Sequence, residues 1–362
     1  MFGILENASR FKTTYILCYK RLKNIIIEIV YIMEEFKKLL AETVNVNTGR
    51  GRKPGTVKNY IYMLNSLATQ LTDKDIAEDN LSFLLNTEEV LQFITVTHNP
   101  RTVRNYITAI MALLLVLDDP AYKTALQEYQ IGINTISDQI AKEHTTQKKS
   151  VKQEANWTTF KKLQSVTSGY LKWLKAHKVF DKEYADMKPN ERKNLRLWLI
   201  SALYTSGVDN PPVRADYAPM KIITDAKFTK LSESERDQNY LVIGKKNRKY
   251  FSFGTYKNVH YHGIKQIPVG KKLNLVLNKY LGTFPYPPEY LLYMQTGTAM
   301  DASGLSASVP KAFEPTGLWV NINQIRHIFI SEHIEGDYIS TKQPIADKMF
   351  HSIGMQEAYR MK

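Results

Sequence analysis

The sequence is poor in cysteine and in acidic residues, and each shortage excludes a class of protein. Cys18 is the only cysteine among 362 residues, so the chain has no disulfide framework and no thiolate zinc site. Its eight histidines lack HxxxH-type spacing, and we expect neither a metal nor another cofactor. Lysine and arginine outnumber aspartate and glutamate by 49 to 35, a formal net charge of +14. Such a basic protein is expected to bind a polyanion, nucleic acid ahead of an acidic membrane surface.

Long apolar runs are missing as well. The most apolar stretch, YILCYKRLKNIIIEIVYIM, is interrupted by four charged side chains and falls short of the roughly 20 residues that cross a bilayer. It also lacks the order of a signal peptide, in which charges precede one apolar core. We expect an intracellular protein that is neither secreted nor bound to a membrane. Residues 1–49 are read as a basic helical arm or extension; for residues 1–32, a DNA-contacting arm and an extension upstream of a start at Met33 both stay open.

Two segments of the N-terminal half echo each other, TVKNYI at 56–61 and TVRNYI at 102–107. In each, a threonine follows turn-forming residues and is predicted to cap a helix, because its hydroxyl can accept from a free first-turn amide. Apolar residues recur behind both at helical spacing. Residues 50–145 are therefore predicted to form an all-helical domain. Residues 146–156 lack apolar periodicity and carry several lysines, which predicts a solvated linker.

Cations gather at the starts of these two predicted helices. They are Arg52, Lys53, Lys58, Arg101 and Arg104. Basic side chains beside free helix-start amides can hold DNA phosphates without reading the base sequence. A solvated charged face explains the same pattern, and both interpretations stay open.

The remaining region, residues 157–362, is predicted to be α+β. A helix after Asn190 places Leu195, Trp198 and Leu203 on one apolar face and stops at Gly207. Three short β-like runs follow, NYLVI, KYFSF and IKQIPV. Separated by turn-forming residues, they predict a three-stranded antiparallel meander. Helical patterns resume toward the end of the chain.

Five residues of this region share one possible chemistry: Arg214, Lys257, Arg326, His351 and Tyr359. A tyrosine oxygen can attack a phosphodiester and hold the DNA covalently. Two guanidinium groups can grip the phosphate oxygens as negative charge builds up. A lysine can protonate the leaving 5′ oxygen, and a histidine can donate to the phosphate or help to take the tyrosine proton.

The local contexts of these residues lead to further expectations. Arg214 follows two prolines in SGVDNPPVRADYAPM, and Asp216 could steady its guanidinium group. Lys257 is expected between two strands of the meander. Four nearby lysines are rivals for its role: Lys245, Lys246, Lys249 and Lys265. Around Arg326, the isoleucines and Phe329 are predicted to bury one face of a helix and to leave the arginine on another.

The order Arg, Lys, Arg, His, Tyr in these contexts resembles the tyrosine recombinase, or phage-integrase-like, family. The form YKNxxxxGxKQIPV is similar to recombinases of large DNA viruses and their mobile elements. The resemblance implies a SAM-like core-binding domain at 50–145 and a catalytic domain at 157–362, of the DNA breaking-rejoining type, mainly helical with a small three-stranded antiparallel sheet. It implies a site-specific recombinase or integrase that works as a tetramer on double-stranded DNA. A 3′-phosphotyrosine intermediate would form without metal or ATP, wherever the target DNA lies: host nucleus, viral factory or cytoplasm.

The sequence departs from the family pattern at two places. Asn323 stands where the family usually has a histidine, and we expect it to position the phosphate rather than to carry a proton. His327 is expected to pack or orient. Only three residues follow Tyr359, whereas many members continue with a segment that docks onto a neighbouring subunit. Three alternatives stay open: a type IB topoisomerase, a telomere resolvase and a non-catalytic DNA-binding relative.

Overall fold

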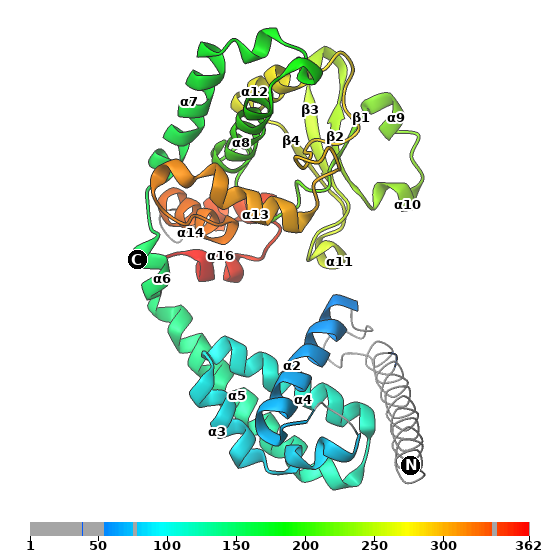
Figure 1. Cartoon of the computed structure of the whole chain (residues 1–362), viewed down its shortest axis with the longest axis vertical. Helices are drawn as coiled ribbons and strands as arrows, with labels where there is room; N and C mark the ends of the chain where they lie inside the picture. Colours follow the sequence, from blue (N-terminus) through cyan, green and yellow to red (C-terminus); the bar gives the residue numbers. More distant parts are fainter. Residues whose placement is uncertain (1–37, 39–53, 75–77, 335–338, 362) are drawn as a thin grey trace, which may run out of the picture. The chain divides into compact units, whose positions relative to one another are not determined.

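The computed structural model describes residue 38 and the ranges 54–74, 78–334 and 339–361 (Figure 1). The described residues fall into two compact units that divide between Thr145 and Thr146. Arg52, Lys53 and all but one residue of the predicted N-terminal arm lie outside the described ranges. In the described part of the chain, no helix is long and apolar enough to cross a bilayer.

The described residues of the first unit are helical. Its elements are α2 (Pro54–Thr72), η1 (Glu78–Leu85), α3 (Thr87–Thr97), α4 (Pro100–Leu117), η2 (Pro120–Tyr122) and α5 (Lys123–Thr146). Their apolar faces meet in one cluster that includes Leu64, Leu67, Ile94, Ile107 and Ile110. The helical spacing in the sequence thus identified the buried faces correctly.

The echoed threonines do not cap their helices. Thr56 and Thr102 lie inside α2 and α4, and the N-cap of α4 is Asn99, whose side chain accepts from the amide of Thr102 at 3.1 Å. The predicted caps were therefore wrong by a few residues. The reason is the proline at the start of each helix, whose fixed φ suits the first turn and moves the boundary upstream.

The second unit combines helices with one small sheet. Its elements are α6 (Val151–Ala155), α7 (Phe160–Ala176), η3 (Val179–Asp181), η4 (Tyr184–Asp186), α8 (Pro189–Thr205), β1 (Lys221–Thr224), α9 (Asp225–Phe228), α10 (Glu233–Arg236), β2 (Asn239–Ile243), η5 (Lys245–Asn247), β3 (Lys249–Phe253), α11 (Val259–His262), β4 (Lys265–Pro268), α12 (Lys271–Leu281), α13 (Ala302–Ala312), η6 (Glu314–Thr316), α14 (Ile322–His333), α15 (Ile339–Lys348) and α16 (Ile353–Tyr359). The segment predicted as a linker contains α6, which begins with a capping box at Ser150.

The sheet has four strands in the order β1-β2-β3-β4, not the predicted three. β2, β3 and β4 pair antiparallel, whereas β1 pairs parallel to β2, with Lys221 opposite Tyr240. The sheet is therefore mixed. β1 was not predicted, because this strand has four residues and none of them is buried.

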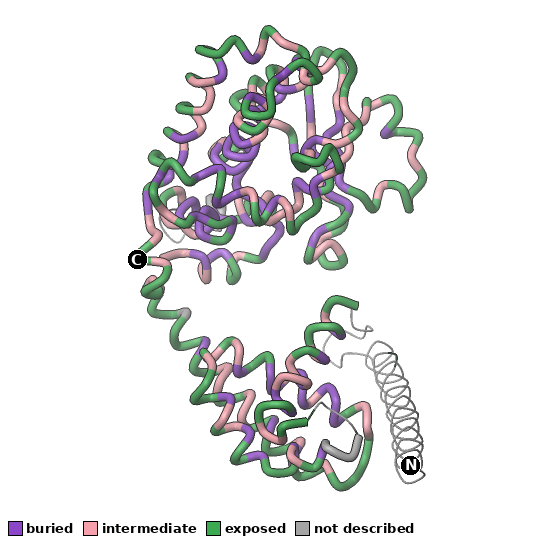
Figure 2. Tube along the Cα trace, in the orientation of Figure 1, coloured by how far each residue is buried: buried purple, intermediate pink, exposed green. Residues whose placement is uncertain are grey.

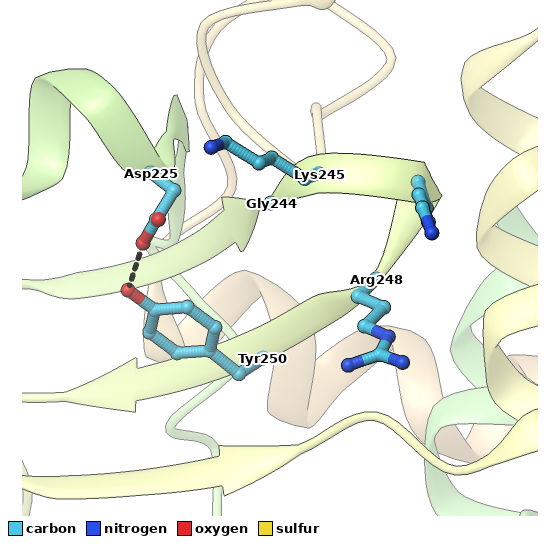
Figure 3. A pocket seen from close by; sticks show the side chains of 6 residues that line it. Asp225, Gly244, Lys245, Arg248 and Tyr250 are labelled. Carbon is cyan, nitrogen blue, oxygen red and sulfur yellow. Dashed lines mark hydrogen bonds between the residues drawn. The ribbon is translucent and has the colours of Figure 1, made fainter.

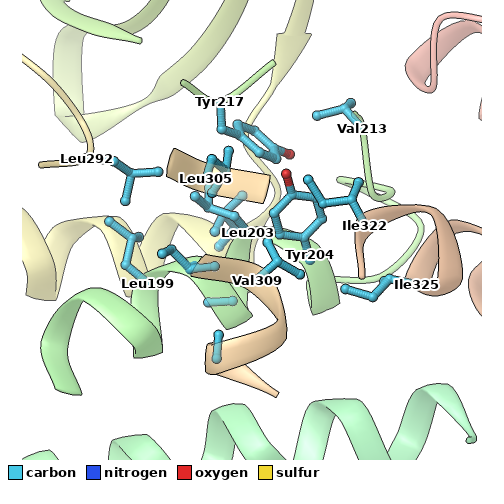
Figure 4. Packing of buried hydrophobic residues seen from close by; sticks show 14 of the residues in the cluster. Leu199, Leu203, Tyr204, Val213, Tyr217, Leu292, Leu305, Val309, Ile322 and Ile325 are labelled. Atoms are coloured by element: carbon cyan, nitrogen blue, oxygen red, sulfur yellow. The ribbon is translucent and has the colours of Figure 1, made fainter. Parts of the chain in front are cut away.

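Helix α8 is the centre of the second unit. Helices α7, α12 and α13 pack against it, and each residue from Leu197 to Thr205 is buried, so the single apolar face predicted for this helix is too narrow. Figure 2 shows purple, buried segments running through this part of the unit. In the last turn of α8, Tyr204 meets Tyr217 edge to face at 5.7 Å, beside Val213 and residues of α14 (Figure 4). This core supports the loop that carries Arg214.

Candidate active site

The Arg214 loop is fastened to three neighbouring elements. The hydroxyl of Tyr204 in α8 donates to the carbonyl of Arg214 at 2.9 Å. Nδ2 of Asn210 donates to the carbonyl of Pro268, the last residue of β4, at 3.1 Å. Its Oδ1 accepts from the amide of Gly270 at 2.7 Å. Nη1 of Arg326, in α14, donates to the carbonyl of Pro212 at 3.0 Å. These bonds fix the backbone before and at Arg214, whose side chain is half-buried.

Arg326 is fully buried, with 0% of its surface exposed. The sequence predicted Arg326 on another face of the helix than the buried one, and that face is buried too, because α16 covers it. Its guanidinium carbon lies 4.8 Å from the ring centroid of Tyr359. Within the described residues, Nε and Nη2 make no hydrogen bond of normal length and angle. Burying such donors costs free energy, so their persistence points to a ligand that satisfies them.

Two side chains of α14 bind the backbone at and just after Tyr359. Its own carbonyl lies 2.7 Å from Nδ1 of His327, and the amide of Met361 donates to the hydroxyl of Ser331 at 2.8 Å. One helical turn apart, His327 and Ser331 thus hold the backbone at and after the tyrosine. Only 9% of the Tyr359 surface is exposed.

An ion pair with a buried lysine links the helix that carries the tyrosine to α15. Nζ of Lys342 in α15 lies 2.5 Å from Oε1 of Glu357 in α16, and only 6% of the lysine side chain is exposed. The neighbouring Gln356 is fully buried. Helix α16 is therefore packed against α14 and α15. The bond from the Met361 amide to Ser331 adds a contact with α14 after the end of α16.

The charges around Tyr359 favour its phenolate. Burial alone would raise the pKa of the phenol, but the positive charges of Arg326 and Arg214, whose N–H groups face the oxygen, outweigh burial and lower this pKa below its ordinary value. A lower pKa gives a larger fraction of the nucleophilic form at a given pH.

His351 lies beside the tyrosine in its neutral form. The two rings are nearly parallel, with centroids 5.6 Å apart. Burial, followed by the charge of Arg326, lowers the pKa of His351 to about 3. Nδ1 lies 3.3 Å from the carbonyl of Ser352, and a carbonyl only accepts, which assigns the proton to Nδ1. Nε2 is then a buried acceptor, and it has no hydrogen-bond partner among the described residues.

Lys257 lies in the turn between β3 and β4, as predicted, and its side chain is exposed. Both of its neighbours in sequence contact Phe350, the residue before His351. Asn258 donates to the Phe350 carbonyl at 3.2 Å, and the rings of Tyr256 and Phe350 have centroids 4.4 Å apart. The structure therefore brings the lysine turn to the histidine end of the site.

Three of the four rival lysines lie elsewhere. Lys245 and Lys246, with Arg248, line a shallow hollow of about 460 Å³ at the turn between β2 and β3 (Figure 3). That turn is at the far end of β3 from Lys257, about 15 Å along a five-residue strand. Lys249 is buried and donates to Asn274 at 3.1 Å. Lys265, at the start of β4, is the rival that stays near Lys257.

Asn323 and Asp216 complete the candidate site. Asn323 is exposed in the first turn of α14, three residues before Arg326 and so on the same side of the helix. The pKa of Asp216 is raised to about 6, because burial outweighs the charges of Arg214 and Arg326. Its Oδ2 has no hydrogen-bond partner among the described residues, so Asp216 acts on the guanidinium groups through its charge.

The candidate DNA-binding residues of the first unit do not come together. Lys58, Arg101 and Arg104 are exposed. Val57 of α2 packs against Ala112 of α4, so Lys58 lies near the end of α4. Arg104 precedes Ala112 by eight residues, about 12 Å along the helix. The two basic helix starts are therefore separate features of this unit.

Several positioning residues were not found from the sequence. Ser331, Asn258 and the pair of Lys342 with Glu357 hold the site through backbone bonds or contacts between helices, and such roles leave no motif. His327 was expected to pack or orient, and its contact with the Tyr359 carbonyl is of that kind. In the described ranges, no group of three or more His, Cys, Asp or Glu residues is placed to hold a metal ion.

Comparison with known proteins leaves the function to be argued from this site. No family model matches the sequence, and neither does any curated protein. Among solved structures, a crystal structure of XerA recombinase aligns over 91% of this chain and 94% of its own length, with 13% sequence identity and a TM-score of 0.34. A likeness this low carries no argument about activity, substrate or assembly.

Proposed function

We propose that this chain is a DNA strand-cleaving and rejoining enzyme, a site-specific recombinase or integrase in which Tyr359 is the nucleophile. One observation carries the proposal. The phenol of Tyr359 lies over the buried guanidinium of Arg326, and the charges of Arg326 and Arg214 lower its pKa. A nucleophile activated by two cations that also bind phosphate suits attack on a phosphodiester.

The proposed cleavage step is a balanced exchange at phosphorus. The Tyr359 oxygen attacks, its proton leaves, and the bond from phosphorus to the 5′ oxygen breaks. Lys257 gives a proton to that oxygen, which leaves as a hydroxyl. The products are a 3′-phosphotyrosine and a free 5′ hydroxyl. Attack by the hydroxyl of a partner strand reverses the step and reseals the DNA.

The cations of the site divide the phosphate between them. Nε and Nη2 of Arg326 make no hydrogen bond of normal length and angle in the described structure, although N–H groups of this arginine face the Tyr359 oxygen. A phosphate oxygen would accept from both donors in the fork geometry that guanidinium groups favour. Arg214 binds a second oxygen from its fastened loop. Asn323, exposed in the first turn of α14, donates an amide hydrogen bond and holds the phosphate without proton transfer.

His351 acts in this scheme as a hydrogen-bond acceptor rather than as a donor. Its Nδ1 proton is directed at the Ser352 carbonyl, and the low pKa leaves Nε2 unprotonated near neutral pH. A phosphodiester carries no proton to give, whereas the phenol of Tyr359 does. With so low a pKa, His351 is a weak base, so it assists loss of the tyrosine proton only by accepting a hydrogen bond from the phenol at Nε2, and the proton itself passes to the surroundings.

The substrate is double-stranded DNA, held by the basic surface of the chain. Strand exchange between two duplexes needs four cleavages, which four protomers on the DNA would supply. Both the target site and the assembly are parts of the proposal.

A covalent-capture experiment tests the activity. We would incubate the full chain with a pool of 5′-labelled, nicked duplexes that carry randomised sequences, so that a short fragment is lost after cleavage and resealing is blocked. Adducts that survive denaturation are recovered and sequenced. We expect a labelled adduct with the wild-type chain and none with Tyr359→Phe.

The other outcomes separate the alternatives. Relaxation of supercoiled plasmid without sequence preference would favour a topoisomerase. Tight binding to duplex DNA with no adduct from any sequence would favour a non-catalytic DNA-binding protein, and would overturn the proposal.

A further inference from the structure

Asn239 joins the two loops that carry Arg214 and Lys257. It is the first residue of β2, and 7% of its surface is exposed. Its Nδ2 donates to the carbonyl of Asp216 at 2.9 Å and to that of Thr255 at 2.9 Å. Its Oδ1 accepts from the amide of Thr255 at 2.9 Å. Both amide hydrogens and the oxygen are therefore engaged, all by backbone.

The two partners of Asn239 are spaced symmetrically about the site. Asp216 is two residues after Arg214, and Thr255 is two residues before Lys257. Through Asn239, a single side chain sets the distance between a phosphate-binding arginine and the candidate acid. A misplacement of about 1 Å in such a pair can cost a factor of about 100 in rate.

Other contacts also restrict the turn that carries Lys257. A Cβ at Gly254 would come within 2.8 Å of the Asp237 backbone, and the hydroxyl of Thr255 donates to the Asp237 carbonyl. On the far side of the lysine, Asn258 is bonded to the Phe350 carbonyl. Among the described residues that hold this turn, Asn239 also bonds the Arg214 loop, at the carbonyl of Asp216.

We infer that Asn239 is a positioning residue that holds Lys257 in register with Arg214 for protonation of the leaving 5′ oxygen. This inference rests on the proposed function. It predicts a defect confined to the cleavage step and, within that step, largely to the departure of the leaving group.

The test replaces the bridging 5′ oxygen with sulfur. A thiol has a pKa near 8.5, far below that of an alcohol, so the thiolate departs without a proton from Lys257. In that substrate the bond from Tyr359 oxygen to phosphorus forms, the phosphorus–sulfur bond breaks, and the phenol proton passes to the surroundings. The probe is the duplex recovered with the wild-type chain, made in oxygen and sulfur versions.

We expect Asn239→Ala to cleave the oxygen substrate about 10 to 100 times more slowly than wild type, with DNA affinity within about twofold. On the sulfur substrate most of that loss disappears, so the ratio of sulfur to oxygen rates rises about tenfold or more. The ratio compares one preparation with itself and is independent of the fraction that folds. Asn239→Asp, which keeps the shape and loses both donors, gives the same direction.

Asn210→Ala is the matched control. Asn210 is also buried, and its amide also bonds two backbone groups, but it ties the Arg214 loop to the end of β4 and does not reach the Lys257 turn. Its loss of rate is expected to be equal on both substrates. If Asn239→Ala behaves in the same way, or loses no activity, the inference is overturned.

Lys257→Met separates this inference from the proposed function. Rescue of Lys257→Met by sulfur with no rescue of Asn239→Ala would reject the role of Asn239 alone. Failure of sulfur to rescue Lys257→Met would reject the lysine as the acid, and no adduct with the wild-type chain would reject the proposed function. The inference falls in both cases.

Discussion

The candidate DNA-binding cations of the first unit and Arg326 of the second unit lie in opposite surroundings. Lys58, Arg101 and Arg104 are exposed at helix starts. Arg326 is fully buried between the Pro212 carbonyl and the Tyr359 ring. Because a buried charge costs free energy unless its surroundings compensate it, the second arrangement is a built site, whereas the first needs no partner. We expect the exposed cations of the first unit to set the affinity for DNA and Arg326 to set the rate.

The largest effect is expected at the nucleophile. Tyr359→Phe keeps a ring over Arg326 and removes the attacking oxygen, so covalent adduct should fall by at least about 10⁴-fold, while DNA affinity stays within about twofold. A denaturing gel of the labelled adduct and a fluorescence-anisotropy titration measure the two quantities. Adduct formation by the Phe variant would show that another residue attacks.

The next effect concerns the buried arginine. Arg326→Lys keeps a positive charge but replaces a planar fork of donors with one ammonium group, and we expect cleavage to slow about 100- to 1000-fold. Single-turnover cleavage at saturating DNA measures it. Arg236→Lys is the control, because Arg236 also donates to a backbone carbonyl, that of Thr229 at 3.0 Å, but outside the site. A similar loss in both variants would contradict a role of Arg326 that is specific to the candidate site.

The secondary structure was predictable where a helix or strand buries one face, because the apolar residues of that face then recur at a regular spacing in the sequence. The helices of the first unit and the meander of β2, β3 and β4 follow from spacing in the sequence. β1 was missed because a strand of four half-exposed residues has no alternation to detect. The caps of α2 and α4 were misplaced because proline, rather than threonine, sets those boundaries.

The site was predictable in its residue types but not in its environment. Periodicity could not show that Arg326 is covered, since the covering residue, Tyr359, is 33 positions away. Asn239 could not be found at all, because its partners are backbone groups of two distant loops. Chemistry identifies the residues that react, and only tertiary structure identifies the residues that hold them.

A smaller effect is expected on stability as the pH falls. The pKa of His351 is lowered to about 3 from an ordinary 6.5, so the unfolded chain takes up a proton that the folded chain refuses. Stability is lost as the pH falls from 6.5 toward 3, by about 1.4 kcal/mol per pH unit. Urea unfolding of wild type and His351→Gln should show the wild type losing about 2 kcal/mol relative to the variant between pH 6.5 and pH 5.

Comparing the wild type with His351→Gln also controls for other groups that titrate in the same pH range. Asp216 has a raised pKa of about 6, and its contribution runs the other way: the folded chain gains stability as the pH falls from 6 toward 3.8. Both proteins carry Asp216, so subtraction removes its effect. Parallel pH profiles for the two proteins would mean that His351 accepts a proton without cost and is less buried than its surroundings indicate.

The smallest effects are expected from the exposed cations, and they sharpen the comparison most. Replacing Lys58, Arg101 or Arg104 singly by Gln should lower the salt slope of DNA binding by about one. The affinity lost between 50 and 200 mM salt should then shrink about threefold per contact. Cleavage at saturating DNA should not change. Lys123, exposed at the start of α5 but outside the echoed segments, is the control.

Because Lys58 lies near one end of α4 and the two arginines near the other, the three variants also locate the DNA on this unit. Equal slopes for all three would require DNA to follow the length of α4. An effect from the arginines alone would assign binding to the start of α4 and leave Lys58 as part of a solvated face. A slower cleavage rate in any of them would contradict the division between cations of the first unit that bind and cations of the candidate site that react.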